Sequence, residues 1–80
     1  MQADDLDFDA YFRAIGARLR ARRHKSGLTQ EDMIAHGFSA RHWQQIEAGR
    51  PITVKTLVRA CRVFGVTPST VLRGLEGELD

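Results

Sequence analysis

Apolar residues recur along the chain three or four positions apart, which is the spacing of a helix face. The first such series predicts one helix over about residues 7–25 with a single apolar face, formed by Phe8, Phe12, Ile15 and Leu19. No segment shows sustained alternation with a period of two, so the pattern does not indicate strands. It predicts an all-α chain.

Hydroxyl residues and glycines divide the rest of the chain into four shorter helices. Each expected helix follows a residue suited to cap a first turn, namely Thr29, Ser39, Thr53 and Thr67. We expect helices over 30–36, from 40 to Gly49, from 54 to Gly65, and from Pro68 to near Gly74. Asp32, three residues after Thr29, approximates a capping box. Together with the first helix this gives five helices.

Within residues 29–49 the sequence predicts two short helices joined by a tight turn at Gly37. The first of the two is too short to be stable alone. We expect it to persist through packing between apolar residues of both helices: Met33, Ala35, Phe38, Trp43 and Ile46. That packing would hold the second helix at a steep angle and leave its other face exposed.

The exposed face of the second helix would carry Ala40, Arg41, Gln44 and Gln45. Arginine can bond a guanine edge through two contacts, glutamine can do the same to adenine, and the alanine methyl can meet a thymine methyl. A projecting helix also fits the major groove of DNA, which is about 12 Å wide. The same residues are common on solvated helix faces, so this pattern alone gives both interpretations equal weight.

The net charge of +2 conceals an asymmetry along the chain. Residues 1–10 hold four aspartates and no Lys or Arg, and residues 76–80 hold three acids and no Lys or Arg. All 12 Lys and Arg lie within residues 11–75, against three acids, a balance of +9. A basic body of this kind favours a polyanionic partner such as nucleic acid.

Several classes of protein are disfavoured. A length of 80 residues allows one domain, and the single cysteine, Cys61, excludes an intrachain disulfide and suits the cytoplasm. No apolar run approaches the ~20 residues that span a bilayer, so we expect no membrane partner. The histidines, His24, His36 and His42, lack the spacing of a zinc site. We therefore expect no metal, no cofactor and no enzymatic activity.

Four stretches of sequence occur in an order that resembles the Cro/C1-type helix-turn-helix family, also called the XRE family. They are IGARLRARR, SGLTQEDM, GFSARHWQQIEAGR and ITVKTLVRACRVFGVTPSTVL, and they span about residues 15–72. The resemblance implies a compact, lambda-repressor-like bundle of five helices that binds operator DNA as a dimer. It divides the chain into an acidic extension of the first helix (1–14), the helix-turn-helix domain (15–75) and an acidic tail (76–80).

The resemblance also implies roles for particular residues. It assigns base reading to Ala40, Arg41, Gln44 and Gln45, and phosphate contacts to Gln30, Ser39, His42, Arg50 and Thr53. Gln44 and His42 match positions that contact phosphate or, in some members, bases. Gln30 would also brace the helix that begins after Ser39. Arg23 and Glu47 match a buried structural ion pair, so Glu47 is not a candidate acid catalyst.

This sequence departs from the family pattern in two segments. EDMIAHG and GRPITV are each one residue shorter than usual, and Arg22 stands where an apolar residue is usual. These differences bear on the docking angle of the helix that follows Ser39.

The preferred hypothesis is a homodimeric transcriptional regulator, of the Cro-like, restriction-controller or antitoxin type, on a near-palindromic double-stranded DNA site. Phe8, Tyr11 and Phe12 lie ahead of the family match, and two roles are open for them. They either lengthen the first helix and cover the bundle, or form part of a dimer surface with residues of the last helix: Val71, Leu72 and Leu75. The alternative is an antitoxin or adaptor module whose main partner is another protein, such as a toxin or another regulator.

Overall fold

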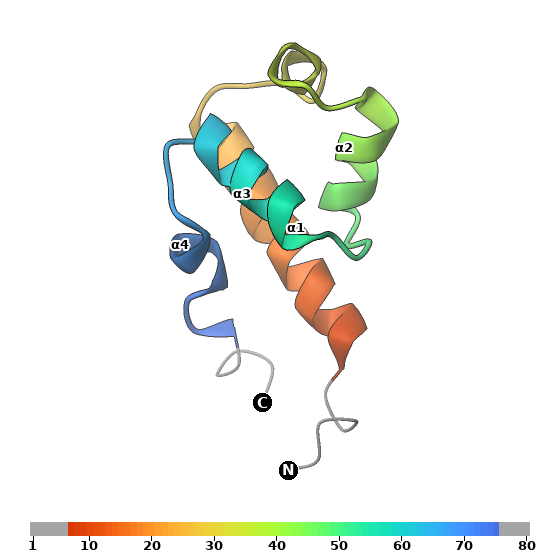
Figure 1. Ribbon diagram of the computed structural model, residues 1–80, viewed down its shortest axis with the longest axis vertical. Helices are drawn as coiled ribbons and strands as arrows, with labels where there is room; N and C mark the ends of the chain where they lie inside the picture. The colour runs from red at the N-terminus through yellow and green to blue at the C-terminus, as the bar shows by residue number, and fades with distance from the viewer. Residues whose placement is uncertain (1–6, 76–80) are drawn as a thin grey trace.

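The computed structural model describes residues 7–75, and every regular element in that range is helical (Figure 1). The elements in chain order are α1 (Phe8–Lys25), the 3-10 helix η2 (Glu31–His36), α2 (Ala40–Glu47), α3 (Val54–Val63) and α4 (Pro68–Leu72). The all-α bundle predicted from the sequence is confirmed. The acidic tail and the first six residues lie outside the described residues.

The predicted caps Ser39 and Thr53 each begin an α-helix, and Asp7 caps a third helix. The Asp7 carboxylate accepts a hydrogen bond from the Ala10 amide at 3.0 Å, and α1 begins after it. In the same way, the Ser39 side chain accepts a hydrogen bond from the His42 amide at the start of α2. The Thr53 side chain accepts one from the Thr56 amide at the start of α3. These bonds satisfy amide groups that a helix start leaves without an intrahelical partner. Local side-chain chemistry therefore sets the start of each of these three helices.

The segment after Thr29 forms the short helix predicted over 30–36, but in the 3-10 form. Thr29 and Asp32 form a reciprocal capping box, with Asp32 Oδ2 accepting from the Thr29 amide at 2.7 Å and Thr29 Oγ1 accepting from the Asp32 amide at 3.1 Å. The helix that follows is a 3-10 helix. A 3-10 helix rises about 2.0 Å per residue against about 1.5 Å for an α-helix, so this short segment covers the distance of a longer α-helix.

The expected packing of this segment is confirmed for Met33 and corrected for Ala35. Met33 is fully buried, but Ala35 is exposed. With three residues per turn, side chains three positions apart share a face, and Ala35 lies two positions from Met33. Only Met33 of the two therefore reaches the core.

The core centres on Trp43, which is fully buried. Its ring meets Phe38 edge-on with centroids 5.0 Å apart and Phe64 with centroids 5.9 Å apart, and such tilted contacts favour aromatic pairs. The other buried apolar residues come from every element: Ile15, Leu19, Met33, Phe38, Ile46, Leu57, Ala60, Cys61, Val71 and Leu75. Cys61 is a free thiol in this core, and burial raises its pKa.

The end of the chain corrects part of the expected dimer surface. Val71 and Leu75 are buried within the fold of the single chain, at 1% and 2% exposure, so they are not available to a partner. Phe8 and Leu72 remain exposed, whereas Tyr11 and Phe12 are partly buried.

A long-range contact fixes α4 in this position. Arg18 of α1 donates from Nη1 to the carbonyls of Val71 at 2.8 Å and Arg73 at 2.6 Å. The Thr67 hydroxyl does not cap α4, contrary to its expected role, and lies instead 2.8 Å from Ser69 Oγ. The carbonyls at the end of α4 therefore receive from α1 the donors that a short helix lacks.

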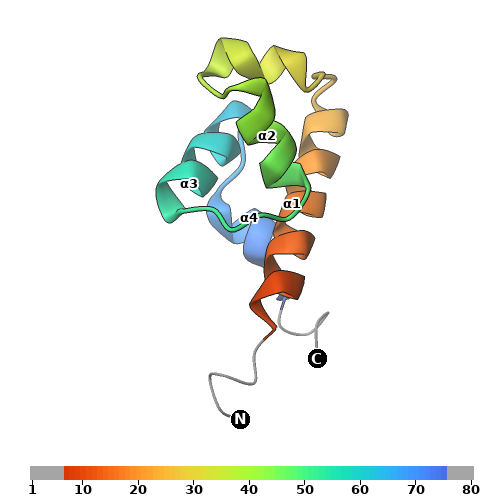
Figure 2. The same cartoon turned by 90° about the vertical axis from the view of Figure 1, so that its right-hand side faces the viewer.

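Glycine lets the backbones of α1 and α2 meet. A Cβ atom on Gly16 would stand 2.5 Å from the Ile46 carbonyl oxygen and 3.0 Å from that of Glu47. The two helices lie side by side in the view that faces α2 (Figure 2). Gly16 therefore determines how closely α2 approaches α1.

We predict that Gly16→Ala lowers the free energy of unfolding by about 1–3 kcal/mol, the usual cost of overpacking. Alanine alone would favour the helix by about 1 kcal/mol, but its methyl group would force the two backbones apart. Chemical denaturation measures the change. Arg20→Ala, at an exposed position of the same helix, should change stability by less than about 0.5 kcal/mol. A more stable Gly16→Ala variant would contradict the close approach.

Candidate nucleic-acid interface

Helix α2 separates its side chains into a buried face and an exposed face. Trp43 and Ile46 point into the core with 0% and 2% exposure. Ala40, Arg41 and Gln44 are exposed on the opposite side. Figure 2 shows α2 at the front of the molecule, with no other helix covering its outer side. The outer face of α2 is thus a polar surface, and the inner face packs against the core.

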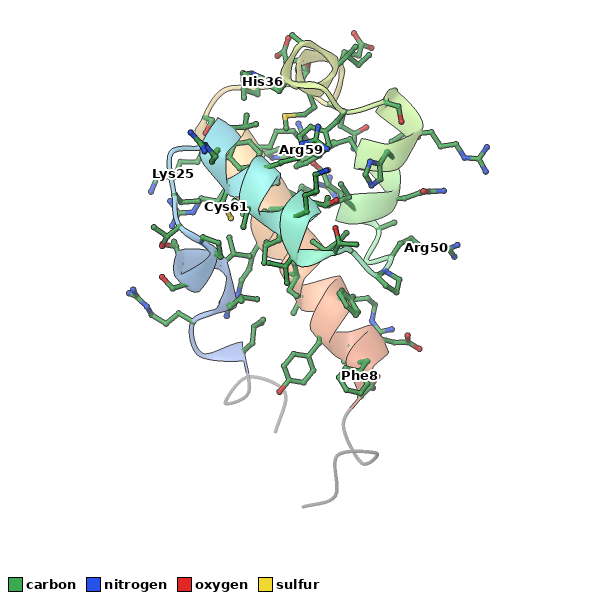
Figure 3. All side chains as sticks on the ribbon, viewed as in Figure 1. Phe8, Lys25, His36, Arg50, Arg59 and Cys61 are labelled. Carbon is green, nitrogen blue, oxygen red and sulfur yellow. The ribbon has the colours of Figure 1, made fainter. Side chains whose placement is uncertain are left out.

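The outer surface of α2 is hollowed next to the loop that follows it. A shallow depression of about 500 Å³ is lined by Arg41, Gln44, Gln45, Ala48 and Arg50. Gln45 is partly buried at its edge, and Arg50 projects away from the end of α2 (Figure 3). Guanidinium and amide groups at its rim can donate to oxygen atoms of a ligand.

The remaining expected contact residues lie around this surface, and several have structural partners. The Ser39 and Thr53 oxygens accept amide hydrogen bonds as helix caps. His42 is partly buried, with its ring 6.1 Å from that of Phe38, and it borders a second hollow of about 260 Å³ with Arg50. Gln30 donates from Nε2 to Glu47 at 3.0 Å, so one of its amide hydrogens is already engaged.

Glu47, at the end of α2, accepts hydrogen bonds from three different segments. Arg23 of α1 donates two hydrogen bonds to the carboxylate, from Nε to Oε2 at 2.6 Å and from Nη2 to Oε1 at 3.1 Å. Gln30 donates a third from Nε2 to Oε1 at 3.0 Å, and the Trp43 indole N–H donates a fourth to Oε2. The side chains of Arg23 and Glu47 are only 7% and 5% exposed. We refer to Arg23, Gln30, Trp43 and Glu47 as the carboxylate hub.

Opposing effects set the pKa of Glu47. Burial by itself would raise the pKa, but the hydrogen bonds from Arg23, Gln30 and Trp43 together outweigh it and hold the pKa below its ordinary value of 4.5. The hydrogen bond to Glu47 in turn raises the pKa of Arg23. The pair therefore stays charged at neutral pH and ties α1 to the end of α2.

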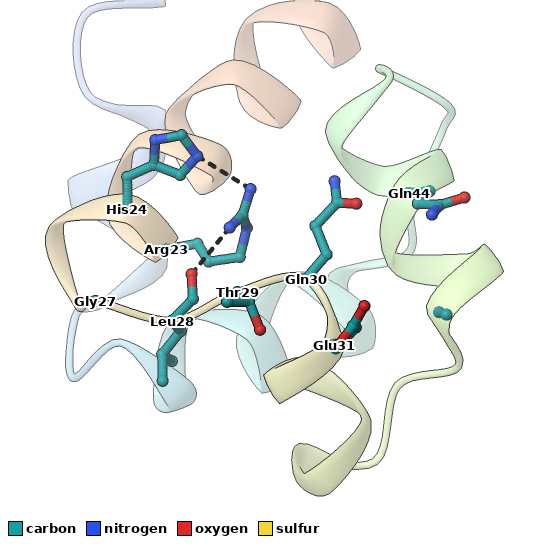
Figure 4. Close-up of a pocket in the computed structure, with 9 residues that line it drawn as sticks. Arg23, His24, Gly27, Leu28, Thr29, Gln30, Glu31 and Gln44 are labelled. Carbon is teal, nitrogen blue, oxygen red and sulfur yellow. Dashed lines mark hydrogen bonds between the residues drawn. The ribbon is translucent and has the colours of Figure 1, made fainter.

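A third hollow, of about 620 Å³, lies between the end of α1, the segment 27–31 and α2 (Figure 4). Arg23 lies at its base and donates to the Leu28 carbonyl at 2.9 Å, and its Nη2 lies 3.1 Å from His24 Nε2. Gln30 and Gln44 line the hollow from different elements. The two amide groups expected to act in phosphate and base contacts therefore face one shared space.

Two arginines that the sequence analysis does not single out also occupy defined places. The Arg59 guanidinium lies 4.6 Å from the Phe38 ring centroid and donates to the Gly37 carbonyl at 3.0 Å, which fixes the turn between η2 and α2. Arg13 lies against Gly49, just beyond α2. Both contacts join residues more than 20 positions apart, so no local pattern could have predicted them.

The described residues offer no group of three or more His, Cys, Asp or Glu side chains that could hold a metal ion. No helix in the described part of the chain is long and apolar enough to cross a membrane.

A family model described as a helix-turn-helix domain matches residues 14–73, which include most of α1 and all of the later helices. Comparison of the chain with curated proteins and with solved structures returned no match.

We predict that Glu47→Gln destabilises the fold by about 3 kcal/mol at pH 7, because it leaves the buried Arg23 without its counter-charge. In the wild type the folded pKa of Glu47 is lowered, so its stabilisation is complete above pH 4.5 and is lost as pH falls through the lower folded value. Urea unfolding between pH 3 and pH 7 should show a shallower acid loss in Glu47→Gln.

Part of the acid dependence should persist in that variant, because hydrogen bonds from the Thr29 amide and hydroxyl also lower the pKa of Asp32. Glu31→Gln, at an exposed position without an ion pair among residues 7–75, is the matched control, and we expect it to change stability by less than about 0.5 kcal/mol. If Glu47→Gln were equally mild, the carboxylate hub would not hold the fold as described.

Proposed function

The chain belongs to the helix-turn-helix domain family, and we propose that it is a sequence-specific transcriptional regulator that reads double-stranded DNA with α2. A helix-turn-helix domain suggests a DNA-binding regulator, and such families are typically not enzymes. Within this family we propose the Cro/C1 type, with residues 15–75 as the domain, 1–14 as an extension of its first helix and 76–80 as a tail.

The observation that carries the proposal is the position of α2. The carboxylate hub and the close approach at Gly16 hold its inner face, while Ala40, Arg41 and Gln44 face outward. An α-helix with its side chains is about 10–12 Å across, so the exposed side of α2 can enter a major groove about 12 Å wide. Rigid support matters because base recognition depends on the register of a few side chains.

We assign base reading to the outer face of α2, with Arg41 toward guanine, Gln44 and Gln45 toward adenine and Ala40 toward a thymine methyl. Phosphate contacts fall to residues around this face: Gln30, Ser39, His42, Arg50 and Thr53. The oxygens of Ser39 and Thr53 act as cap acceptors, which leaves the Ser39 hydroxyl hydrogen to point toward a phosphate. The Thr53 hydroxyl donates a hydrogen bond to Thr56 Oγ1 at 3.2 Å, and a phosphate contact would replace that bond. Gln30 keeps one amide hydrogen beyond its bond to Glu47.

We further propose that two copies bind a near-palindromic operator, with their α2 helices in successive major grooves about 34 Å apart. Exposed apolar side chains that could join the subunits are Phe8 on α1, Val54 and Val58 on α3, and Leu72 on α4. Sedimentation equilibrium tests this directly. A protein that remains monomeric at high concentration, with and without DNA, would contradict the homodimer.

Selection of bound sequences from a random DNA pool tests the whole proposal. We expect enrichment of a site with two related halves. If instead the protein shows no shift of DNA at low salt and forms a salt-independent complex with another protein, the interaction-module alternative would replace this proposal.

For Arg41→Ala we expect a loss of about 1–3 kcal/mol in binding the selected site and relaxed preference at one base pair, because its guanidinium makes two contacts to a guanine edge. Titration of the selected site and of single-base variants measures both effects. An equal loss on random DNA would contradict a base-reading role.

Arg50→Ala should weaken binding to the selected site and to random DNA by similar factors, because a phosphate contact carries no sequence information. The slope of log affinity against log salt concentration should fall in magnitude by about 1. Affinity measured over a range of salt concentrations checks this, and a change confined to the selected site would count against the assignment.

A further inference from the structure

Helix α1 begins before the region that matches the family, and its first turns reach the far end of α2. A Cβ atom on Gly49 would stand 2.7 Å from Arg13 Cγ and 2.8 Å from Arg13 Cα. The stem of Arg13 therefore lies directly against the turn that ends α2. Arg50, a proposed phosphate contact, is the next residue after Gly49.

The position of Arg13 on α1 places it beside the C-terminal end of α2. Gly16, which touches the α2 backbone, lies three residues further along the same helix, and residues three apart are neighbours on a helix surface. Figure 2 shows this part of α1 alongside α2 in the view that faces α2. Arg13 thus lies at the end of α2 opposite the Ser39 cap, against the residue that precedes Arg50.

The Arg13 side chain is exposed, and within residues 7–75 no ion pair or hydrogen bond engages its guanidinium. Asp9, one turn earlier on α1, is also exposed and is the acid close to it along the helix. An exposed pairing between the two would contribute little and could be displaced by a phosphate. A guanidinium suits a phosphate because its fork of donors matches two oxygens.

We propose that Arg13 contacts a phosphate of the bound DNA next to the one contacted by Arg50. This inference rests on the proposed function, and it extends the proposed DNA-contacting surface beyond the residues that match the helix-turn-helix domain. The part of α1 that precedes the family match then has a role of its own, since it carries the Arg13 charge to the rim of the major groove. Arg13 would set affinity and position without reading sequence.

A purely structural role for Arg13 makes a different prediction. Its aliphatic stem covers Gly49, and a methionine could do the same without the charge. Arg13→Met therefore removes the guanidinium while keeping an unbranched stem, and Arg13→Lys restores the charge. Arg62→Met is the matched control, because Arg62 is an exposed arginine on α3 that borders a separate hollow with His36 and Arg59.

The experiment measures affinity for the selected operator and for random DNA over a range of salt concentrations. For Arg13→Met we expect binding to both DNAs to weaken about three- to tenfold and the salt slope to fall in magnitude by about 1, with unchanged base preference. Arg13→Lys should recover most of the affinity, and Arg62→Met should keep the wild-type slope. Thermal unfolding checks that each variant is folded.

A second measurement locates the contact. Single phosphates of the operator are replaced one at a time by uncharged methylphosphonates. We expect one replacement that weakens the wild type to have no further effect on Arg13→Met, and that position should neighbour the one whose effect is lost in Arg50→Ala.

The outcomes separate this inference from the proposed function. If Arg41→Ala and Arg50→Ala behave as predicted but Arg13→Met matches Arg62→Met, the Arg13 contact is wrong and the proposed function stands. If the wild type binds no DNA at low salt, both are wrong.

Discussion

The carboxylate of Glu47 is the interaction on which the arrangement of the other elements depends. Its oxygens accept hydrogen bonds from Arg23 of α1, from Gln30 just before η2 and from Trp43 within α2 itself. A buried carboxylate is costly unless its oxygens are paired, and here four donors meet that requirement. Removing any one of these partners would loosen a different element, which explains how a single side chain can join three segments.

This hub also explains why a short 3-10 helix can support a recognition surface. Helix η2 has six residues and buries only Met33, too little to hold its position by itself. It is fixed at its start by the Thr29–Asp32 capping box and by Gln30, and near its end by the bond from Arg59 to the Gly37 carbonyl. Contacts with α1 and α3 therefore fix the positions of the turn and of α2.

The consequence for function is a helix that is rigid on its inner side and free on its outer side. Gly16 brings α1 against the backbone of α2, and the indole of Trp43 fills the space behind it. The outer arginine and glutamines have no role in the core and can be used for recognition. The same close packing brings the first turns of α1 to the C-terminal end of α2, where Arg13 lies against Gly49.

The sequence by itself determined the number of helices, their starting residues and the separation of α2 into apolar and polar faces. These features depend on caps and periodicity within three or four residues, so they can be read locally. Tertiary structure decided the rest. The 3-10 form of η2, the burial of Val71 and Leu75, and the contacts of Arg18, Arg59 and Arg13 arise between segments 20 or more residues apart or from the space left between them. No local pattern carries that information, because it is created only when the helices pack.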